Sequence, residues 1–337
     1  MPAAPASHVA DHLSPAAIRR ALERAWWPVC RVEDCVTPHR ATLLERALVV
    51  FHTADGQPRV ADDRCPHRGA SLAGGSVDGD AIACPYHGWR WDAASGRCRH
   101  IPSLIDQRRI PSAARLATYP AAERWGLVWT CLAPADAAAP LPDPDWLREL
   151  DWVHGIVRRD LDANVLLVHE NFRDVAHFGF VHPDTVPVAT TTVEPLEPRR
   201  DGPIVRLERR VDTLDQGPTW LSAEAFVQRY EAIAPSFVSY RADFGAAGTT
   251  YLLNCPSPVS LERTRGFFVR GIDAGRADLL PELLAAEERI ADEDAAIVST
   301  CEPRRLGEPL DHQVHTLSDG FTLAFRRAFF DYVRAAA

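Results

Sequence analysis

Two short segments that each pair a cysteine with a histidine constrain the fold more than any other feature of the sequence. The first reads Cys65-Pro-His67 and the second reads Cys84-Pro-Tyr-His87, with sixteen residues between them. Two thiolates and two imidazoles on two loops predict one metal site with four ligands, at the tips of a β domain. A tetrahedral structural zinc uses such ligands. So does a two-iron cluster, which holds both cysteines on one iron and both histidines on the other. The four residues alone leave both centres open.

The composition favours metal binding over disulfides as the role of these cysteines. The chain has 337 residues, eight cysteines and a formal net charge of −9. We find no secretory signal, so we expect a cytoplasmic, reducing compartment. No apolar run approaches the length of a membrane span, and an acidic chain is a poor candidate for binding nucleic acid. The chain contains no lysine, which excludes Schiff-base chemistry on lysine and a P-loop.

The pattern of apolar residues predicts an α+β chain with two domains. Ser14 and Pro15 begin a helix within residues 1–25. Short apolar runs at 47–52, 81–84 and 126–132 predict strands of an all-β domain over residues 26–135. The stretch 133–144 has the composition of a linker. The second domain, residues 136–337, is predicted to have helices at 165–180 and 277–300 and strands at 204–211, 226–233, 249–253 and 265–272.

A second set of potential ligands lies in the second domain. Asp174, His177 and His182 follow the spacing D-x2-H-x4-H. On a helix, Asp174 and His177 would share a face, and Gly179 could end or bend that helix so that His182 turns back toward His177. Two converging imidazoles suit a mononuclear non-heme iron(II), whose 2-His-1-carboxylate site keeps open positions for O2 and substrate. Two histidines at this spacing also occur in ordinary cores and surfaces, so the spacing alone does not establish a site.

Longer stretches around both motifs resemble one protein family. Residues 65–72 and 84–89 are similar over their whole length to the cluster loops of Rieske domains. Residues 170–182 resemble the iron-binding helix of Rieske non-heme iron oxygenases. Among these, the short catalytic subunits are most similar, such as vanillate and dicamba O-demethylases and the hydroxylases of saxitoxin biosynthesis. The resemblance runs from Trp27 to Arg327, and between 194 and 277 it holds only in outline.

The resemblance implies both the fold and the first cofactor. It implies an N-terminal all-β Rieske domain whose [2Fe–2S] cluster is held by Cys65, His67, Cys84 and His87. It further implies a C-terminal α+β catalytic domain, with an antiparallel sheet wrapped around helices in a START-like or helix-grip-like fold.

The resemblance also implies the residues of the second centre. A mononuclear Fe(II) would be held by His177, His182 and an aspartate on a late helix. Asp294 matches that aspartate best, with Asp292 as the competitor. Glu287 and Glu288, earlier on that helix, are expected to lie on its solvent-exposed face.

Two further residues receive catalytic roles from the resemblance. Asp174 matches the acid that, in homotrimers of this family, bridges a Rieske histidine of one subunit and an iron-ligand histidine of the next. Asn171 lies one helical turn before Asp174 and is expected near the iron.

The function implied is that of a terminal oxygenase component. It would be a monooxygenase that uses O2 and external electrons to hydroxylate a small organic substrate, with or without O- or N-demethylation. No dinucleotide-binding motif follows a predicted strand, so a separate reductase or ferredoxin is expected.

Two other functions stay open: a cis-dihydroxylating aromatic-ring dioxygenase, and a Rieske electron-transfer protein. The sequence does not identify the substrate. Arg241 and Arg270 could meet a substrate carboxylate, although surface arginines are common.

Overall fold

The chain divides into two compact units. The computed structural model describes residues 13–148, 150–186, 190–212, 225–310 and 312–336. One unit is Glu23–Pro140, and the other is Leu141–Ala337 together with the segment that ends at Leu22. The division after Pro140 falls inside the stretch with linker composition, while the domain limits predicted at residues 25 and 135 stay predictions. Within the described ranges, no helix is both long and apolar enough to cross a membrane.

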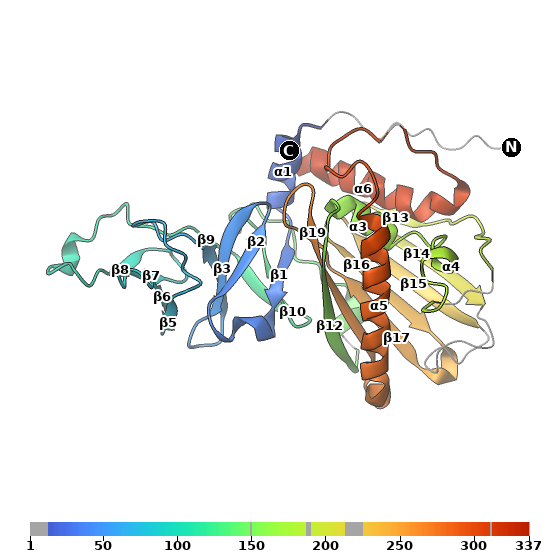
Figure 1. The fold of residues 1–337 in the computed structure, drawn as a ribbon, viewed down its shortest axis with the longest axis horizontal. Helices are drawn as coiled ribbons and strands as arrows, with labels where there is room; N and C mark the ends of the chain where they lie inside the picture. Colours follow the sequence, from blue (N-terminus) through green and yellow to red (C-terminus); the bar gives the residue numbers. More distant parts are fainter. Residues whose placement is uncertain (1–12, 149, 187–189, 213–224, 311, 337) are drawn as a thin grey trace. The chain divides into compact units, whose positions relative to one another are not determined.

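The unit Glu23–Pro140 is built from three small antiparallel sheets (Figure 1). Their strand orders are β1-β11-β10, β2-β3-β4-β9 and β5-β6-β7-β8. The strands predicted at 47–52, 81–84 and 126–132 are confirmed as β3, β6 and β11. The bounds are β1 (Trp27–Arg31), β2 (His39–Leu43), β3 (Arg46–His52), β4 (Pro58–Asp62), β5 (Ser76–Asp78), β6 (Ala81–Ala83), β7 (Arg90–Asp92), β8 (Cys98–His100), β9 (Thr118–Tyr119), β10 (Ala121–Arg124) and β11 (Leu127–Thr130).

The core of this unit determines where its two cysteine-bearing loops begin. Phe51, Ile82 and Trp91 are almost fully buried in one apolar cluster, and Cys65 and Cys84 belong to the same cluster. Because a core of this kind is close-packed, the backbone at each cysteine is held in place by its neighbours. The two loops therefore start from fixed points on a shared base.

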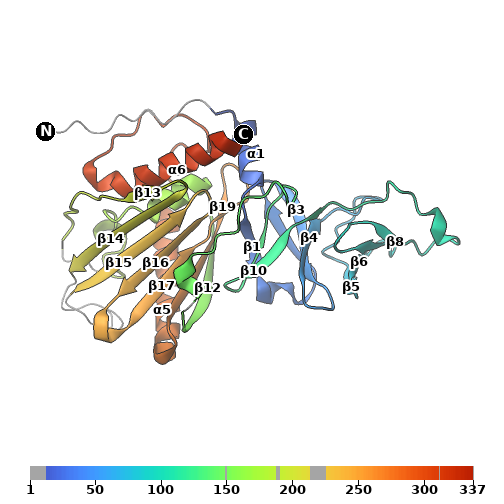
Figure 2. The same cartoon turned by 180° about the vertical axis from the view of Figure 1, so that it is seen from behind.

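The other unit places a long helix across an eight-stranded antiparallel sheet. The strand order is β12-β19-β17-β16-β15-β14-β13, with β18 paired to β19. Figure 1 shows α5 over one face of this sheet, and Figure 2 shows the sheet from the opposite side. The strands are β12 (Trp152–Leu161), β13 (Arg199–Asp201), β14 (Ile204–Asp212), β15 (Ala225–Ile233), β16 (Phe237–Asp243), β17 (Thr249–Asn254), β18 (Ser257–Pro258) and β19 (Thr264–Asp273). Within the described residues, the α-helices are α1 (Pro15–Glu23), α2 (Asp145–Arg148), α3 (Val165–Asn171), α4 (Phe178–Val181), α5 (Leu280–Val298) and α6 (Gly320–Ala336).

Helix α5 packs on the sheet through a stripe of residues at helical spacing. Leu283, Glu287 and Ala291 are all buried on this stripe, four residues apart. The expectation that Glu287 faces solvent is wrong, because it shares this stripe and is only 2% exposed. Glu288 is exposed as expected. A glycine on β12 allows close packing, since a Cβ at Gly155 would lie 2.6 Å from the Leu284 side chain.

The segment predicted as one helix over 165–180 is broken in its middle. Helix α3 begins after Asn164, whose side-chain oxygen accepts hydrogen bonds from two backbone N–H groups of the first turn. It ends at Asn171, and α4 starts at Phe178. Between them, the Asp174 carboxylate accepts a hydrogen bond from the backbone N–H of Ala176 at 2.8 Å. Such a local bond competes with the helix, so the prediction that Asp174 and His177 share a helical face is wrong.

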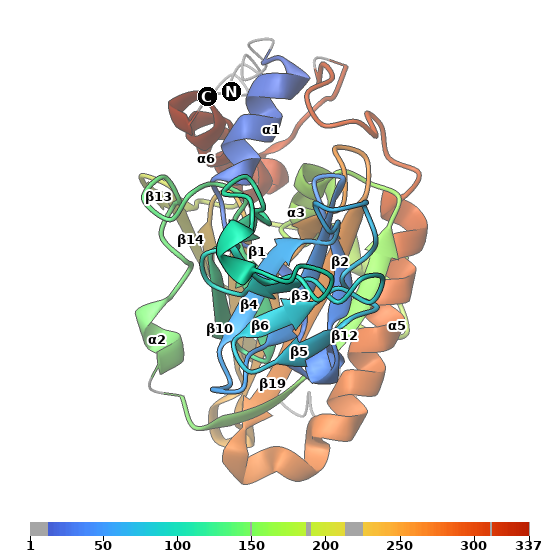
Figure 3. The same ribbon diagram turned by 90° about the vertical axis from the view of Figure 1, so that its left-hand side faces the viewer.

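Helix α6 packs against α3 and also against β14. Arg326 on α6 donates two hydrogen bonds to the buried carboxylate of Glu170 on α3, at 2.5 and 2.7 Å. At its other end, α6 lies beside α1 (Figure 3), where the Tyr332 hydroxyl donates to the carbonyl of Ala21 at 3.3 Å. The paired guanidinium and carboxylate fix the end of α3 from which Asn171 and the following loop extend.

Candidate metal centres

The two loops with the C-x-H and C-x2-H motifs share one backbone conformation. In the first, the N–H of Gly69 donates to the carbonyl of Cys65 at 2.8 Å, and the N–H of Cys65 donates to Ala70. In the second, the N–H of Gly88 donates to the carbonyl of Cys84 at 3.0 Å. Both glycines have positive φ, 74° and 68°, a region that glycine enters without steric cost. The same turn therefore follows the cysteine in both loops.

The side chains of these loops converge. The rings of His67 and His87 have centroids 4.7 Å apart, and the His67 ring stacks on Trp89 at 4.3 Å. Cys65 and Cys84 are free thiols, 2% and 4% exposed. The structure thus brings the two predicted histidine ligands together, and it brings the two predicted cysteine ligands together.

The donor set of this first centre fits a metal group. Burial, together with the neighbouring Cys84 thiol, raises the pKa of Cys65 to about 11. Two adjacent buried thiols become thiolates at neutral pH when a cation supplies the compensating charge. The two imidazoles beside them complete the two-thiolate, two-imidazole set that Rieske clusters use.

The second centre lies at α4 and α5. One ligand atom each from His177, His182 and Asp294 lies within 4.8 Å of the others, the one such group of acids, cysteines and histidines found in the part of the chain that the structure describes. Nε2 of His182 is 3.1 Å from Oδ1 of Asp294, and Nε2 of His177 is 3.5 Å from the same oxygen. Both imidazoles therefore direct the same ring nitrogen toward one carboxylate.

The electrostatics of this second centre favour a cation. Burial alone would lower the pKa of His177, but Asp174 and Asp294 raise it to about 9. Burial would raise the pKa of Asp294, but the two imidazoles and the Asn171 amide lower it to about 2. Both ring nitrogens of His177 are buried without a hydrogen-bond partner. A metal ion at the point that the imidazoles share would supply the missing partner and the positive charge.

Glu293 and Thr185 hold His182 in position, although neither residue was predicted from the sequence. Nδ1 of His182 donates to the Glu293 carboxylate at 2.7 Å, and the Thr185 hydroxyl donates to the same carboxylate at 3.0 Å. A proton held on Nδ1 leaves the lone pair on Nε2, the nitrogen that faces Asp294. Glu293 precedes Asp294 directly, so the sequence signal was present, but only the structure shows its partner.

The remaining predicted residues lie near this centre, except the alternative acid. The Asn171 amide donates to Asp294 at 3.0 Å, and the Asp174 carboxylate is 3.6 Å from Nδ1 of His177. Asp292 instead points to solvent and forms an ion pair with Arg159. The geometry therefore favours Asp294 over Asp292 as the carboxylate of this centre.

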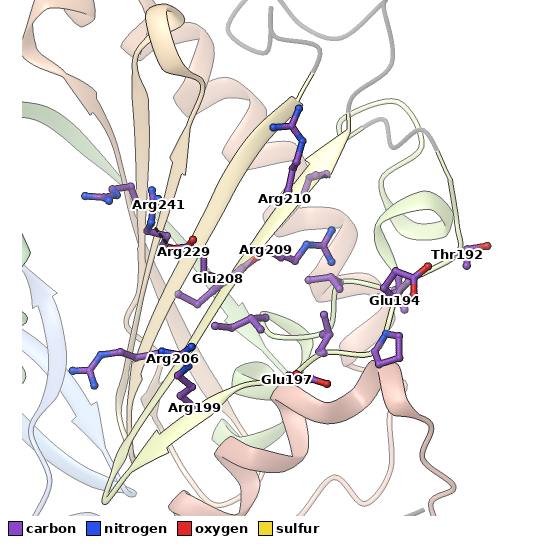
Figure 4. Close-up of a pocket in the computed structure, with 18 of the residues that line it drawn as sticks. Thr192, Glu194, Glu197, Arg199, Arg206, Glu208, Arg209, Arg210, Arg229 and Arg241 are labelled. Atoms are coloured by element: carbon purple, nitrogen blue, oxygen red, sulfur yellow. Dashed lines mark hydrogen bonds and ion pairs between the residues drawn. The ribbon is translucent and has the colours of Figure 1, made fainter. Parts of the chain in front are cut away.

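A cavity of about 1080 Å³ reaches the loop that carries these ligands. Val175 and Ala176, between Asp174 and His177, belong to its wall, and so does Tyr230 on β15. Figure 4 shows that arginines from β14, β15 and β16 line much of the rest. The cavity provides space for a small organic molecule beside the second centre.

Family comparisons match both halves of the chain. Residues 25–120 match the family described as Rieske [2Fe-2S] domain. Residues 161–335, more than half of the chain, match the family described as vanillate O-demethylase oxygenase C-terminal domain.

Curated relatives are similar over about half of the chain or somewhat more. Methylxanthine N1-demethylase NdmA of Pseudomonas putida is 33% identical over 184 residues, which are 50% of this chain and 49% of the relative. Cholesterol 7-desaturase of Xenopus laevis is 35% identical over 167 residues, 48% of this chain and 35% of the relative. A 3-ketosteroid-9-alpha-monooxygenase oxygenase component of Rhodococcus rhodochrous is 28% identical over 251 residues, 67% of this chain and 58% of the relative. In each case the chain spans less than two thirds of the relative's length.

Solved structures share the fold over nearly the whole chain. NdmA of Pseudomonas putida with caffeine has a TM-score of 0.80 at 24% identity, covering 95% of this chain and 96% of that chain. Dicamba monooxygenase bound to dicamba has a TM-score of 0.80 at 19% identity, covering 93% and 98%. At these identities the likeness concerns the fold alone, and it confirms the predicted all-β domain followed by an α+β domain.

Proposed function

We propose that this chain, which belongs to the Rieske oxygenases with a vanillate O-demethylase C-terminal domain, is the terminal oxygenase component of a monooxygenase system. A Rieske domain implies a [2Fe–2S] cluster, and this oxygenase family uses a mononuclear iron. The reaction proposed is hydroxylation of a small organic substrate by O2, with or without O- or N-demethylation. The observation that carries the proposal is the convergence of His177, His182 and Asp294 beside a cavity.

We assign the ligands by their donor sets. Cys65, His67, Cys84 and His87 would hold the cluster, and His177, His182 and Asp294 would hold the iron(II). When bound, the cluster supplies single electrons and the iron supplies the place where O2 is activated.

The protein's own groups prepare the iron site in three ways. The low pKa of Asp294 keeps it an anionic ligand. Glu293 keeps the proton of His182 on Nδ1. The Asn171 amide occupies one lone pair of Asp294 and so restricts which lone pair faces the imidazoles.

Asp174 is proposed as a relay between the two kinds of centre. Its carboxylate faces Nδ1 of His177 at 3.6 Å and remains 37% exposed, so one side is available to a second imidazole. We propose a homotrimer in which that imidazole is His67 or His87 of a neighbouring subunit.

Electrons would come from a separate reductase or ferredoxin. We propose a cytoplasmic location, where thiols such as these stay reduced.

Iron content tests the function directly. The purified chain is expected to hold three irons, two in the cluster and one outside it. Asp294→Ala is expected to lose the single iron and keep the absorbance of the cluster. Asp292→Ala is the matched control and is expected to keep all three, because Asp292 pairs with Arg159 at the surface. Two irons in the wild-type chain would indicate an electron-transfer protein and contradict an oxygenase.

The product separates the kinds of oxygenation. Hydroxylation of a methyl carbon on oxygen or nitrogen gives a hemiacetal or hemiaminal that releases formaldehyde. A screen of small substrates with reductase and O2, scored for formaldehyde and for hydroxylated products, distinguishes demethylation from plain hydroxylation. Formation of cis-diols instead would favour an aromatic-ring dioxygenase.

A further inference from the structure

Arg209 stands on the face of the sheet that also carries Gln228 and Tyr230 of β15. Along β14, Leu207 and Arg209 are more buried than Arg206 and Glu208, which follow the alternation of a strand. Arg209 lies opposite Gln228 on β15, and Gln228 is 3% exposed. In Figure 4, Arg209 points to the side of the sheet on which Glu194 lies, while Arg206 extends to the other side.

Among the described residues, the guanidinium of Arg209 has no anionic partner. Its Nε is buried without a hydrogen-bond acceptor, and no described acid, Glu194 included, forms an ion pair with it. Neighbouring arginines differ: Arg206 donates to Glu231 at 2.6 Å, and Arg229 donates to Glu208 at 2.7 Å. A buried donor left without an acceptor costs free energy, so this group calls for a ligand or another explanation.

Arg209 shares its cavity with the loop of the second metal centre. Both Arg209 and Ala176, the residue before His177, line this cavity. Tyr230 lies opposite Leu207, two residues before Arg209 on β14, so the two side chains are diagonal neighbours on one face of the sheet, and both line the cavity. The ring of Tyr230 is in turn 6.4 Å from Phe172, the neighbour of Asn171.

The two arginines considered from the sequence are already engaged. Arg270 is 3.8 Å from the buried carboxylate of Glu287, and Arg241 lies over the ring of Trp146 at 5.8 Å. Arg270 is therefore paired, and Arg241 lies opposite Arg229 on β15, on the other face of the sheet from Gln228 and Arg209.

We propose that Arg209 anchors a carboxylate of the substrate and thereby selects anionic organic substrates. This inference rests on the proposed function, because it takes the cavity beside the second centre as the substrate site. A guanidinium offers parallel N–H donors that match the two oxygens of a carboxylate. Pairing would satisfy the buried Nε and hold the rest of the molecule against Tyr230, in the cavity that reaches the iron loop.

Equilibrium binding tests the anchor without turnover. Benzoate, its neutral counterpart benzamide, and inorganic phosphate are titrated into the metal-loaded chain by calorimetry, with no reductant present. Benzoate is expected to bind about tenfold or more tightly than benzamide, since a charged hydrogen bond is lost in benzamide. Arg209→Gln should weaken the binding of benzoate by a similar factor and leave the affinity for benzamide unchanged. Arg209→Lys should recover part of the benzoate affinity.

A control variant and the titration with inorganic phosphate show which results would contradict the proposed role of Arg209. Arg200→Gln removes a positive charge from β13, where Arg200 pairs with Asp331 and is not among the residues that line the cavity, and it is expected to bind benzoate as the wild type does. The anchor is wrong if benzoate does not bind the wild type, or binds Arg209→Gln equally well. It is also wrong if phosphate binds as tightly as benzoate, which would indicate a general anion site. Iron content, measured in parallel, decides the proposed function separately from this result.

Discussion

Two consecutive carboxylates perform different tasks on one imidazole. Neighbouring residues on a helix are about 100° apart around its axis, so Glu293 and Asp294 approach His182 from two sides. Glu293 accepts the proton of Nδ1 at 2.7 Å, and Asp294 lies 3.1 Å from Nε2. The ring is thereby held in one orientation and one tautomer before any metal binds. Pre-arrangement of this kind lowers the cost of assembling the site.

Replacement of Glu287 by glutamine is expected to change how the stability of the metal-free protein depends on pH. Burial raises the pKa of Glu287 from 4.5 to about 7, although Arg270 opposes the rise. Through that interval the native state keeps a proton that the unfolded state has released, so the free energy of unfolding falls as pH rises. This loss amounts to about 3 kcal/mol and should be absent from Glu287→Gln. Urea unfolding at about pH 4 and about pH 8 brackets the interval, and the difference between the wild type and the variant isolates the contribution of Glu287 from that of His177.

A neighbouring residue provides the control for this experiment. Glu288 follows Glu287 on α5 but is exposed, so Glu288→Gln should show the pH dependence of the wild type. In Glu287→Gln, Arg270 loses its partner and adds an offset that does not vary with pH. A Glu287→Gln variant that loses stability with rising pH as steeply as the wild type would show that Glu287 ionises normally in the native state.

At the scale of elements, the loop before β5 must pass close to β6, next to the second cysteine. A Cβ at Gly75 would lie 2.1 Å from the carbonyl oxygen of Ala83, a backbone atom that cannot turn aside. Gly75→Ala is therefore expected to push β6 outward and to destabilise the Rieske unit by about 1–3 kcal/mol. Since Ala83 precedes Cys84, cluster content should fall as well. Cluster absorbance per chain and thermal unfolding measure both effects.

A variant of the adjacent glycine is the control that distinguishes steric crowding from the general effect of adding a methyl group. A Cβ at Gly74 would meet its nearest neighbour at 3.7 Å, an ordinary contact. Gly74→Ala should therefore keep its cluster and its stability to within about 1 kcal/mol. Equal losses in the two variants would mean that the close approach to Ala83 does not limit this loop.

The sequence predicts those elements whose signals are local. The two cysteine loops carry their ligands, prolines and glycines within a few residues, so their turns could be read directly. Strand β12 was not predicted, because Arg159 and Asp160 interrupt its apolar pattern. Their partners, Asp292 and Arg265, are distant in sequence.

The contrast between local signals and distant partners also explains which residues of the second metal centre could be predicted. The spacing of His177 and His182 indicated the site, but the choice of its carboxylate depends on how α5 is rotated. That rotation follows from packing of the stripe that includes Leu283 and Ala291, which a motif does not contain. The buried Glu287 was mistaken for a surface residue for the same reason. The end of α3 at Asn171 was missed because a local hydrogen bond from Asp174 competes with helix continuation.

For the whole molecule, the proposal requires electrons to pass between centres in two separate units. Each unit has its own sheets and its own candidate ligands. The residue proposed to connect them, Asp174, contacts His177 of its own chain. If the partner imidazole belongs to another subunit, a single chain is not a complete enzyme. This requirement can be tested with subunits that each lack one centre.

Mixed trimers are expected to recover activity from two inactive variants. His67→Ala should lack the cluster, and His177→Ala should lack the single iron. A cyclic trimer that contains both variants has one junction where a cluster-bearing subunit meets an iron-bearing neighbour. Its activity should therefore be about a third of that of the wild-type trimer. Co-expression with two affinity tags isolates mixed trimers, and turnover is measured on the substrate that the screen identifies. Separately purified variants, combined without subunit exchange, should stay inactive. Mixed trimers with both metal centres present but no turnover would place electron transfer within one chain and remove the intersubunit role of Asp174.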